Sequence, residues 1–275
     1  MIRPAEESDQ SRNLYARGYI LRDDAEPAAP GHWMRARFGE WHLAHDPRLP
    51  AAQTRLRLFG CELLALGVLV DARHPEEDPD ACLSRLARAL ARSEEALHAA
   101  LDHTGGRYVL AYRRRGRAGV VSDATGMKPV FYHARGPRIV TSHPGLIMEN
   151  APVGPRRPLP AKFGYPGVRG PVQHSMMLTP NAALDLAGMT PARVWPRGVL
   201  AERSVGEAAE IVRTHMGGLM RHVRRHHRLL VSVTAGLDSR LTLSFLKDAQ
   251  KADLPRQRHI ADFVEKNGST IPGRN

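Results

Sequence analysis

An apolar segment that runs into a loop of small residues, LLVSVTAGLDSRLTLSFL at residues 229–246, constrains the fold more than any other stretch. Leu229–Val233 is short and rich in β-branched side chains, which predicts a fully buried parallel strand. The loop Thr234–Ser239 follows, and apolar residues then recur at helical spacing from Leu237 to Phe245. A strand, a small-residue loop and a helix present backbone N–H groups and a helix N-terminus, so this arrangement predicts an anion-binding site.

The loop resembles the pyrophosphate-binding loop of the ATP pyrophosphatases, whose pattern is Ser-Gly-Gly-x-Asp-Ser. Thr234 stands at the first serine and Ala235 at the first glycine, while Gly236, Asp238 and Ser239 match. The resemblance implies ATP and Mg²⁺ as cofactors, with Asp238 as the metal ligand. It implies one set of nucleotide-binding residues: Thr234, Ala235, Gly236, Leu237, Asp238 and Ser239. The alternative is an ordinary strand and helix, in which the helix dipole alone favours Asp238.

Length and composition narrow the class of protein. A chain of 275 residues suits one large domain or two ordinary ones. No run of 18 apolar residues occurs, so no membrane span is expected, and the acidic start MIRPAEESDQ does not resemble a secretory signal. Cys61 and Cys82 lack metal-site spacing and are expected to be buried, reduced thiols. We therefore expect a cytoplasmic protein.

The formal net charge of +12 raises the alternative of a nucleic-acid-binding protein. The positive charge is almost all arginine in a chain rich in alanine, leucine, glycine and proline, which indicates a composition bias. The clusters Arg113–Arg115 and Arg224–Arg228 fall in a predicted hairpin turn and at a helix end. Nucleic acid is therefore not the expected partner. Three histidines at the same helix end, His222, His226 and His227, are attributed to the helix dipole and not to a metal site.

The hydrophobic pattern predicts further elements along the chain. Strands are expected at residues 18–21, 41–44, 107–112, 118–121, 129–132 and 138–142, and residues 55–70 are expected to form one or two strands. The strands after residue 107 are expected to form one antiparallel meander. Helices are expected over 80–90 and 93–101, the second one ended by Gly105-Gly106. A capping box at Ser204–Glu207 opens a third helix, which Gly217-Gly218 weakens. Its expected apolar stripe is Ala208, Val212, Met216, Leu219 and Val223.

A second resemblance lies in GGRYVLAYRRRGRAGVVSDATGMKPVFYH, residues 105–133. This fragment resembles the glutaminase-type half of the asparagine synthases, in which a hairpin precedes an Arg-Asp-x-x-Gly-x-x-Pro-Leu-Tyr-Tyr pattern. The matching residues are Asp123, Gly126, Pro129 and Tyr132. Residues 178–195 resemble the segment by which the chain leaves that half. Together with the loop at residues 234–239, the order of motifs resembles the family over about residues 55–250. Asp123 itself is expected to be a simple turn residue.

The family resemblance implies an α/β fold. Residues 1–200 would form an N-terminal-nucleophile, glutaminase-like antiparallel sandwich, and residues 201–275 would begin the parallel sheet of a PP-loop ATP pyrophosphatase. The implied activity is that of a carbon–nitrogen ligase, in which ATP adenylates a carboxylate and an amine then displaces AMP. The expected substrate is a small-molecule or peptide carboxylate. The expected protein partner is either a second copy of this chain, as a homodimer, or a chain that completes the synthetase domain.

Two departures from the family shape these expectations. Active glutaminase halves use a cysteine directly after the initiator methionine, whereas Ile2 follows Met1 here. We therefore expect no glutaminase activity, as the resemblance to β-lactam synthetases and lasso-peptide cyclases also implies. Too few residues follow Ser239 to complete a parallel sheet, so the second domain is expected to be incomplete and the chain truncated. A non-catalytic docking or remnant protein of the same fold is the alternative.

Overall fold

The computed structural model describes residues 13–154, 156–158, 165, 167–229, 231 and 236–246. The described strands are β1 Tyr19–Arg22, β2 Met34–Phe38, β3 Trp41–His45, β4 Ala51–Leu56, β5 Cys61–Asp71, β6 Thr104–Arg114, β7 Arg117–Ser122, β8 Phe131–His133, β9 Ile139–Thr141, β10 Ser175–Met177, β11 Ala182–Asp185 and β12 Thr190–Arg193. The described helices are α2 Pro79–Arg92, α3 Glu94–Leu101, α4 Pro144–Asn150, α5 Val205–His226, α6 Leu237–Ser244 and the short 3-10 helix η1 Arg57–Phe59. None of these helices is both long enough and apolar enough to cross a membrane.

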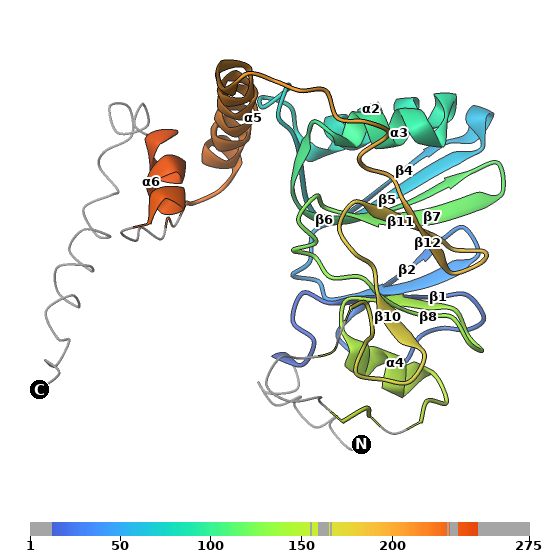
Figure 1. The fold of residues 1–275 in the computed structure, drawn as a ribbon. Helices are drawn as coiled ribbons and strands as arrows, with labels where there is room; N and C mark the ends of the chain where they lie inside the picture. The colour runs from blue at the N-terminus through green and yellow to red at the C-terminus, as the bar shows by residue number, and fades with distance from the viewer. Residues whose placement is uncertain are drawn as a thin grey trace, which may run out of the picture.

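Two six-stranded sheets face each other, and every strand pair in them is antiparallel (Figure 1). The strand order is β10-β8-β9-β1-β3-β2 in the first sheet and β12-β11-β7-β6-β5-β4 in the second sheet. Helices α2 and α3 cover the outer face of the second sheet, and α4 lies on the outer face of the first sheet. The described chain is therefore a mixed α/β fold with four layers.

Three apolar clusters hold these layers together. The cluster between the two sheets is the largest and contains Tyr19, Leu21, Trp41, Leu43, Leu64, Leu66, Val109, Val120 and Leu184 among others. A second cluster joins β5 and β6 to α2 and α3, and a third joins the first sheet to α4. Strand β5 contributes side chains to both faces of its sheet. This explains why its sequence is almost continuously apolar, although its neighbours are antiparallel.

The predicted meander after residue 107 is only partly correct. Strands β6 and β7 form the expected hairpin in the second sheet. The chain then crosses to the first sheet, where β8 pairs with β9 and β10. Asp123 organises this crossing, because its buried carboxylate accepts hydrogen bonds from the backbone N–H groups of Thr125, Met127 and Lys128 and from the Thr125 hydroxyl. The turn role predicted for Asp123 therefore agrees with its contacts.

The prediction that Gly105-Gly106 ends a helix is wrong. Helix α3 ends at Leu101, and both glycines lie in β6. Gly106 has a φ of +113°, and an added Cβ would overlap the carbonyl oxygen of Val68 on β5. A glycine is needed here for two reasons. The β5 and β6 backbones approach too closely to leave room for a Cβ, and other residues rarely adopt this positive φ.

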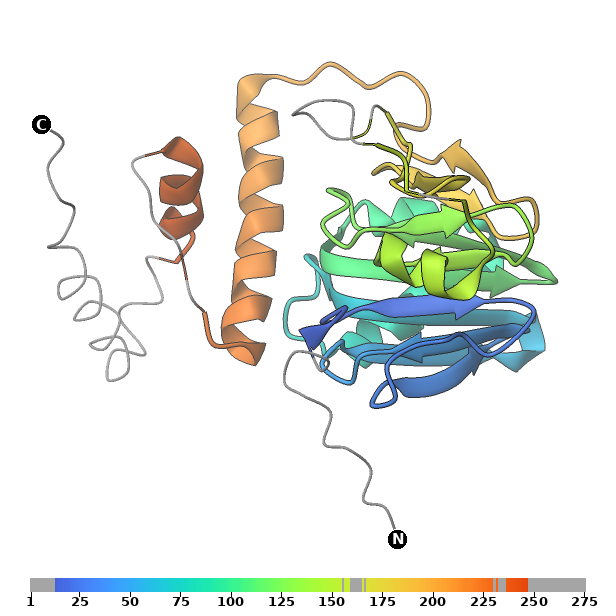
Figure 2. The same cartoon turned by 90° about the horizontal axis from the view of Figure 1, so that it is seen from below.

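Helix α5 starts at the predicted capping box. The Ser204 hydroxyl accepts from the Glu207 N–H at 3.3 Å, and the Glu207 carboxylate accepts from the Ser204 N–H at 2.8 Å. The helix stands beside the sandwich and separates it from α6 (Figure 2). The expected apolar stripe is wrong in its first half, because Ala208 and Val212 are exposed. The side of α5 that meets the sandwich is instead marked by two buried residues, Gly218 and His222.

Gly218 sets the distance between α5 and the sandwich. A Cβ at this position would overlap the carbonyl oxygen of Ala72, which directly follows β5. One turn further along the helix, His222 Nδ1 lies 3.0 Å from the Pro75 carbonyl oxygen. The helix-end position of His222 is as predicted, but its burial against the sandwich is not explained by the helix dipole. The expectation that the two glycines weaken the helix misses the contact that Gly218 makes.

A Gly218→Ala substitution is expected to separate α5 from the sandwich. Overpacking typically costs about 1–3 kcal/mol, which exceeds the gain of up to about 1 kcal/mol from replacing glycine by alanine in a helix. Gly217→Ala is the matched control, because within the described part of the chain an added Cβ at Gly217 would come near only the tip of the Arg221 side chain, at 3.5 Å. Gly218→Ala should lower the free energy of unfolding in urea and the protection of the α5 amides from hydrogen exchange. Gly217→Ala should lower neither. Equal effects of the two variants would contradict this account.

Candidate functional site

The predicted nucleotide loop is described only in its second half. Thr234 and Ala235 lie outside the described residues, as does most of the predicted strand before them. Within that strand, Leu229 and Val231 are described, and neither belongs to a β-strand. Gly236 is the N-cap residue of α6, which begins at Leu237 as the sequence predicts. The nucleotide-binding roles of this loop stay predictions.

The described half of the loop forms the first turn of α6. Asp238 is exposed in this turn, next to the positive end of the helix dipole. The Ser239 hydroxyl donates to the Gly236 carbonyl oxygen at 3.3 Å. An exposed carboxylate at a helix N-terminus is compatible both with a metal ligand and with the ordinary capped helix that we gave as the alternative.

A second polar site surrounds the start of β1 and was not predicted from the sequence. We call it the β1 cluster, and it consists of Arg17, Asp46, Arg48, Lys128, Ser142 and His143. All six residues lie just before or just after a strand of the first sheet. Arg17 precedes β1, Asp46 and Arg48 follow β3, Lys128 precedes β8, and Ser142 and His143 follow β9. The sequence gives these residues no common motif.

Asp46 is the buried anion of the β1 cluster, with no exposed surface. Burial alone would raise the pKa of its carboxyl group. Hydrogen bonds from the Arg48 side chain and from the backbone N–H groups of Arg48 and Arg17 outweigh this effect and lower the pKa to about 2. The Arg17 N–H reaches Asp46 Oδ2 at 2.6 Å. The ionised carboxylate therefore fixes the backbone just before β1.

Lys128 is the buried cation of the β1 cluster. Burial, together with the nearby charges of Arg107 and Arg17, lowers the pKa of its amine to about 8, although Asp46 opposes this shift. Its Nζ donates to the Arg17 carbonyl oxygen at 2.6 Å. At neutral pH the amine thus binds the same residue that Asp46 holds by its N–H. This hydrogen bond gives the amine a structural role, because it joins the segment before β8 to the backbone before β1.

Ser142 and His143 complete the β1 cluster on the side of β9. The Ser142 hydroxyl accepts from the Tyr19 N–H at 2.9 Å and lies 2.8 Å from His143 Nδ1. Burial lowers the pKa of His143, and the Lys128 charge lowers it further. A serine next to a neutral histidine resembles a nucleophile–base pair. The hydroxyl, however, is already bonded to the first strand, so the geometry favours a structural role.

The two cysteines are buried and reduced, as predicted. Cys61 is the first residue of β5, and Cys82 lies in α2, in the apolar cluster between the second sheet and its helices. Burial raises the pKa of both thiols, that of Cys82 to about 12. Neither residue belongs to the β1 cluster. Among the described residues no group of three or more histidine, cysteine, aspartate or glutamate side chains is arranged to hold a metal ion.

The two segments that carry the asparagine synthase resemblance contact each other. Gly126 has a φ of +64° in the turn before β8, and an added Cβ would lie 2.9 Å from Pro180 Cγ. The Leu178 N–H donates to the Val130 carbonyl oxygen at 2.8 Å. Residues 123–132 and 178–195 are far apart in the sequence, yet they form one continuous structure.

Comparisons with known proteins give a distant similarity of fold. The chain is similar to a solved structure described as the allosteric regulatory enzyme of purine biosynthesis, at 12% identity and a TM-score of 0.40, over 68% of this chain and 45% of that one. It is also similar to glutamine phosphoribosylpyrophosphate amidotransferase from B. subtilis, solved with ADP and GMP, at 12% identity and a TM-score of 0.38, over 71% of this chain and 46% of that one. The chain thus spans less than half of each of these proteins. No protein-family model and no curated protein matches the sequence.

The Asp46→Asn substitution tests the β1 cluster by its pH dependence. A carboxyl group whose pKa falls from 3.8 to about 2 on folding stabilises the fold above pH 4, and this contribution disappears as the pH falls through 2. Asp46→Asn should therefore lower the free energy of unfolding by about 1–3 kcal/mol at pH 7, with a gap to the wild type that narrows toward pH 2. Urea unfolding across this range measures the gap.

Asp80→Asn is the control for that series, because Asp80 is an exposed carboxylate in the first turn of α2. The free energy of unfolding of Asp80→Asn should stay close to that of the wild type from pH 7 to pH 2. A gap between Asp46→Asn and the wild type that is constant from pH 7 to pH 2 would show that ionisation of Asp46 does not stabilise the fold.

Proposed function

We propose that this chain carries the glutaminase-like half of an asparagine synthase-like, ATP-dependent amide-forming ligase, and that this half does not hydrolyse glutamine. The observation that carries the proposal is the contact between residues 123–132 and 178–195, the two segments that resemble the family. They lie in a sandwich of two antiparallel sheets, as the resemblance implies. The capped helix α5 and the Gly-Leu-Asp-Ser start of α6 follow in the order expected of the family.

The absence of glutaminase activity is proposed from the state of the thiols. The glutaminase reaction needs a cysteine thiolate with a base beside it. Both cysteines of this chain are buried in apolar surroundings that raise their pKa and favour the unreactive thiol. The backbone before β1 is held by Asp46 and Lys128. The sandwich would then support a ligase that receives its amine from the substrate, as in the β-lactam synthetases and lasso-peptide cyclases.

In the proposed ligase reaction ATP adenylates a substrate carboxylate, and an amine displaces AMP to form the amide. The described residue with a role in this step is Asp238, which would hold Mg²⁺ beside the phosphates. Gly236 and Ser239 would offer backbone and hydroxyl donors at the start of α6, and Thr234 and Ala235 would complete the loop. Binding and charge neutralisation account for most of the catalysis in such a site.

A non-catalytic docking protein of the same fold is the second candidate. The observation that favours it is the exposure of apolar side chains on α5 and α6, the two helices that follow the sandwich in the sequence. Val205 and Val212 on α5 are 88% and 45% exposed, and Leu237 and Leu241 on α6 are 76% and 52% exposed. Apolar surface of this kind is usually covered in the working state of a protein. The occupant that fits the ligase family is a partner that completes the nucleotide-binding sheet.

Mg·ATP binding tests the ligase proposal. Isothermal titration should detect binding of Mg·ATP to the wild-type chain, and Asp238→Ala should weaken binding by about tenfold or more because a metal ligand is lost. Asp80→Ala is the matched control, because Asp80 is also an exposed carboxylate in the first turn of a helix. A folded wild-type chain with no affinity for Mg·ATP would contradict the ligase proposal and favour the docking protein.

The glutaminase prediction has its own assay. The purified chain is expected to release no glutamate from glutamine above the rate of the buffer control. Glutamate release that disappears in Cys61→Ala or Cys82→Ala would overturn the proposed inactivity.

Nucleic-acid binding with a steep dependence on salt would instead favour the alternative of a basic nucleic-acid-binding protein.

A further inference from the structure

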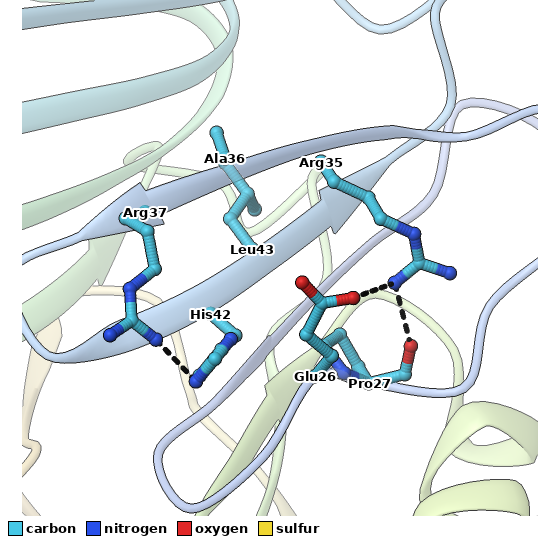
Figure 3. Close-up of a pocket in the computed structure, with 7 residues that line it drawn as sticks. All are labelled: Glu26, Pro27, Arg35, Ala36, Arg37, His42 and Leu43. Atoms are coloured by element: carbon cyan, nitrogen blue, oxygen red, sulfur yellow. Dashed lines mark hydrogen bonds and ion pairs between the residues drawn. The ribbon is translucent and has the colours of Figure 1, made fainter.

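A small cavity of about 190 Å³ opens on the outer side of the first sheet, at its β2 edge (Figure 3). Strands β2 and β3 form one wall, and the loop after β1 forms the other. The lining residues are Glu26, Pro27, Arg35, Ala36, Arg37, His42 and Leu43. Its volume suits a small ion or headgroup better than a drug-sized ligand.

Strand register explains why basic side chains meet in this cavity. His42 on β3 pairs directly with Arg37 on β2 and with Arg22 on β1. The three side chains therefore project from the same face of the sheet in one row. Arg35, two residues before Arg37, projects from that face as well. The cavity thus lies beside four basic residues that three neighbouring strands place together.

The charges in this row are unequally neutralised. Arg22 makes two hydrogen bonds to Asp24, at 2.6 and 3.2 Å. Arg35 lies 3.6 Å from the Glu26 carboxylate. Arg37, in contrast, directs a guanidinium nitrogen at His42 Nε2, and no carboxylate in the described part of the chain forms an ion pair with it. A guanidinium paired with an imidazole nitrogen leaves its positive charge uncompensated.

We propose that Arg35, Arg37 and His42 form a binding site for a dianionic phosphate group, either inorganic phosphate or a small phosphomonoester. Guanidinium groups donate two parallel hydrogen bonds to phosphate oxygens, which makes arginine the usual residue for such recognition. A bound phosphate would supply the negative charge that Arg37 lacks. The site lies on the outer face of the first sheet and involves none of the β1 cluster or of the predicted nucleotide loop, so the proposal is independent of the ligase proposal.

Glu26 competes with the ligand for this site. Its carboxylate is 68% exposed and points into the cavity toward Arg35 (Figure 3). An exposed ion pair of this length contributes little stability, so a phosphate displaces it readily. We therefore expect basic and acidic residues of this site to have opposite effects on the affinity for phosphate. Loss of an arginine weakens phosphate binding, and loss of Glu26 strengthens it.

The test is titration with inorganic phosphate and, in a second arm, glycerol phosphate, at constant ionic strength in a chloride buffer. Isothermal titration and the ring signals of His42 in NMR spectra follow binding. Arg37→Gln should weaken it about tenfold or more, and Glu26→Gln should tighten it about threefold. The matched controls are Arg88→Gln, an exposed arginine on α2, and Glu202→Gln, an exposed glutamate before α5, and neither should change the affinity.

Each outcome decides the proposal. Saturable binding by either ligand, with the opposite effects of Arg37→Gln and Glu26→Gln and with shifts at His42, supports the site. A stronger affinity for glycerol phosphate assigns it to phosphomonoesters, and an equal affinity assigns it to the phosphate group alone. Absence of saturable binding, or equal weakening by Arg37→Gln and Arg88→Gln, overturns the proposal and leaves an ordinary solvated basic edge. Circular dichroism of each variant verifies that the fold is retained.

Discussion

Burial of the central strands on both faces of their sheets is the constraint on which the rest of this structure depends. Two antiparallel sheets pack against each other, and helices α2, α3 and α4 cover their outer faces. The central strands must therefore be apolar on both sides, and β5 and β6 are the longest examples. Several polar groups become buried at the points where the chain enters or leaves a strand, among them Asp46, Lys128 and Ser142. The charged residues that do become buried there need partners, because an unpaired buried charge is costly.

The β1 cluster shows how these buried charges are used. Asp46 and Lys128 have opposite charges, yet the structure directs both at the backbone of Arg17, one at its N–H and the other at its carbonyl oxygen. Ser142 holds the next strand residue, Tyr19. The segment before β1 is thus an integral part of the sandwich. This supports the view that the sandwich serves as a scaffold, and it removes these polar groups from the set that is available for hydrolysis.

Local patterns predicted the individual elements well. The apolar runs at β1, β3 and β5, the hairpin of β6 and β7, and the capped helices α2, α3 and α5 lie where the sequence indicates, because each depends on residues close together in the chain. Sheet assignment was not predictable in this way. The crossing between β7 and β8 looks like one more turn of a meander, since a turn residue such as Asp123 does not specify which sheet the next strand joins. Strand β2 was missed because Met34–Phe38 contains two arginines and lies at the edge of its sheet.

The candidate sites were harder to predict for the same reason. Gly218 looks like a helix-weakening residue until its contact with Ala72 is known. The β1 cluster is assembled from segments that lie between Arg17 and His143, and the basic cavity from a loop and two strands within residues 26–43. Neither set of residues forms a recognisable motif. The predicted loop at residues 234–239 is a local motif, and its described half begins a helix as expected. Its function depends on groups beyond the motif, so nucleotide binding has to be measured.

Amide hydrogen exchange at Arg17 and Tyr19 tests most directly the claim that the segment before β1 is a fixed part of the sandwich. Both N–H groups donate to buried side chains, at 2.6 Å to Asp46 and at 2.9 Å to Ser142. The account predicts that they exchange as slowly as the central amides of β6, because they open only when the sandwich unfolds. Exchange of Arg17 and Tyr19 at the rate of unprotected amides, while β6 stays protected, would contradict it.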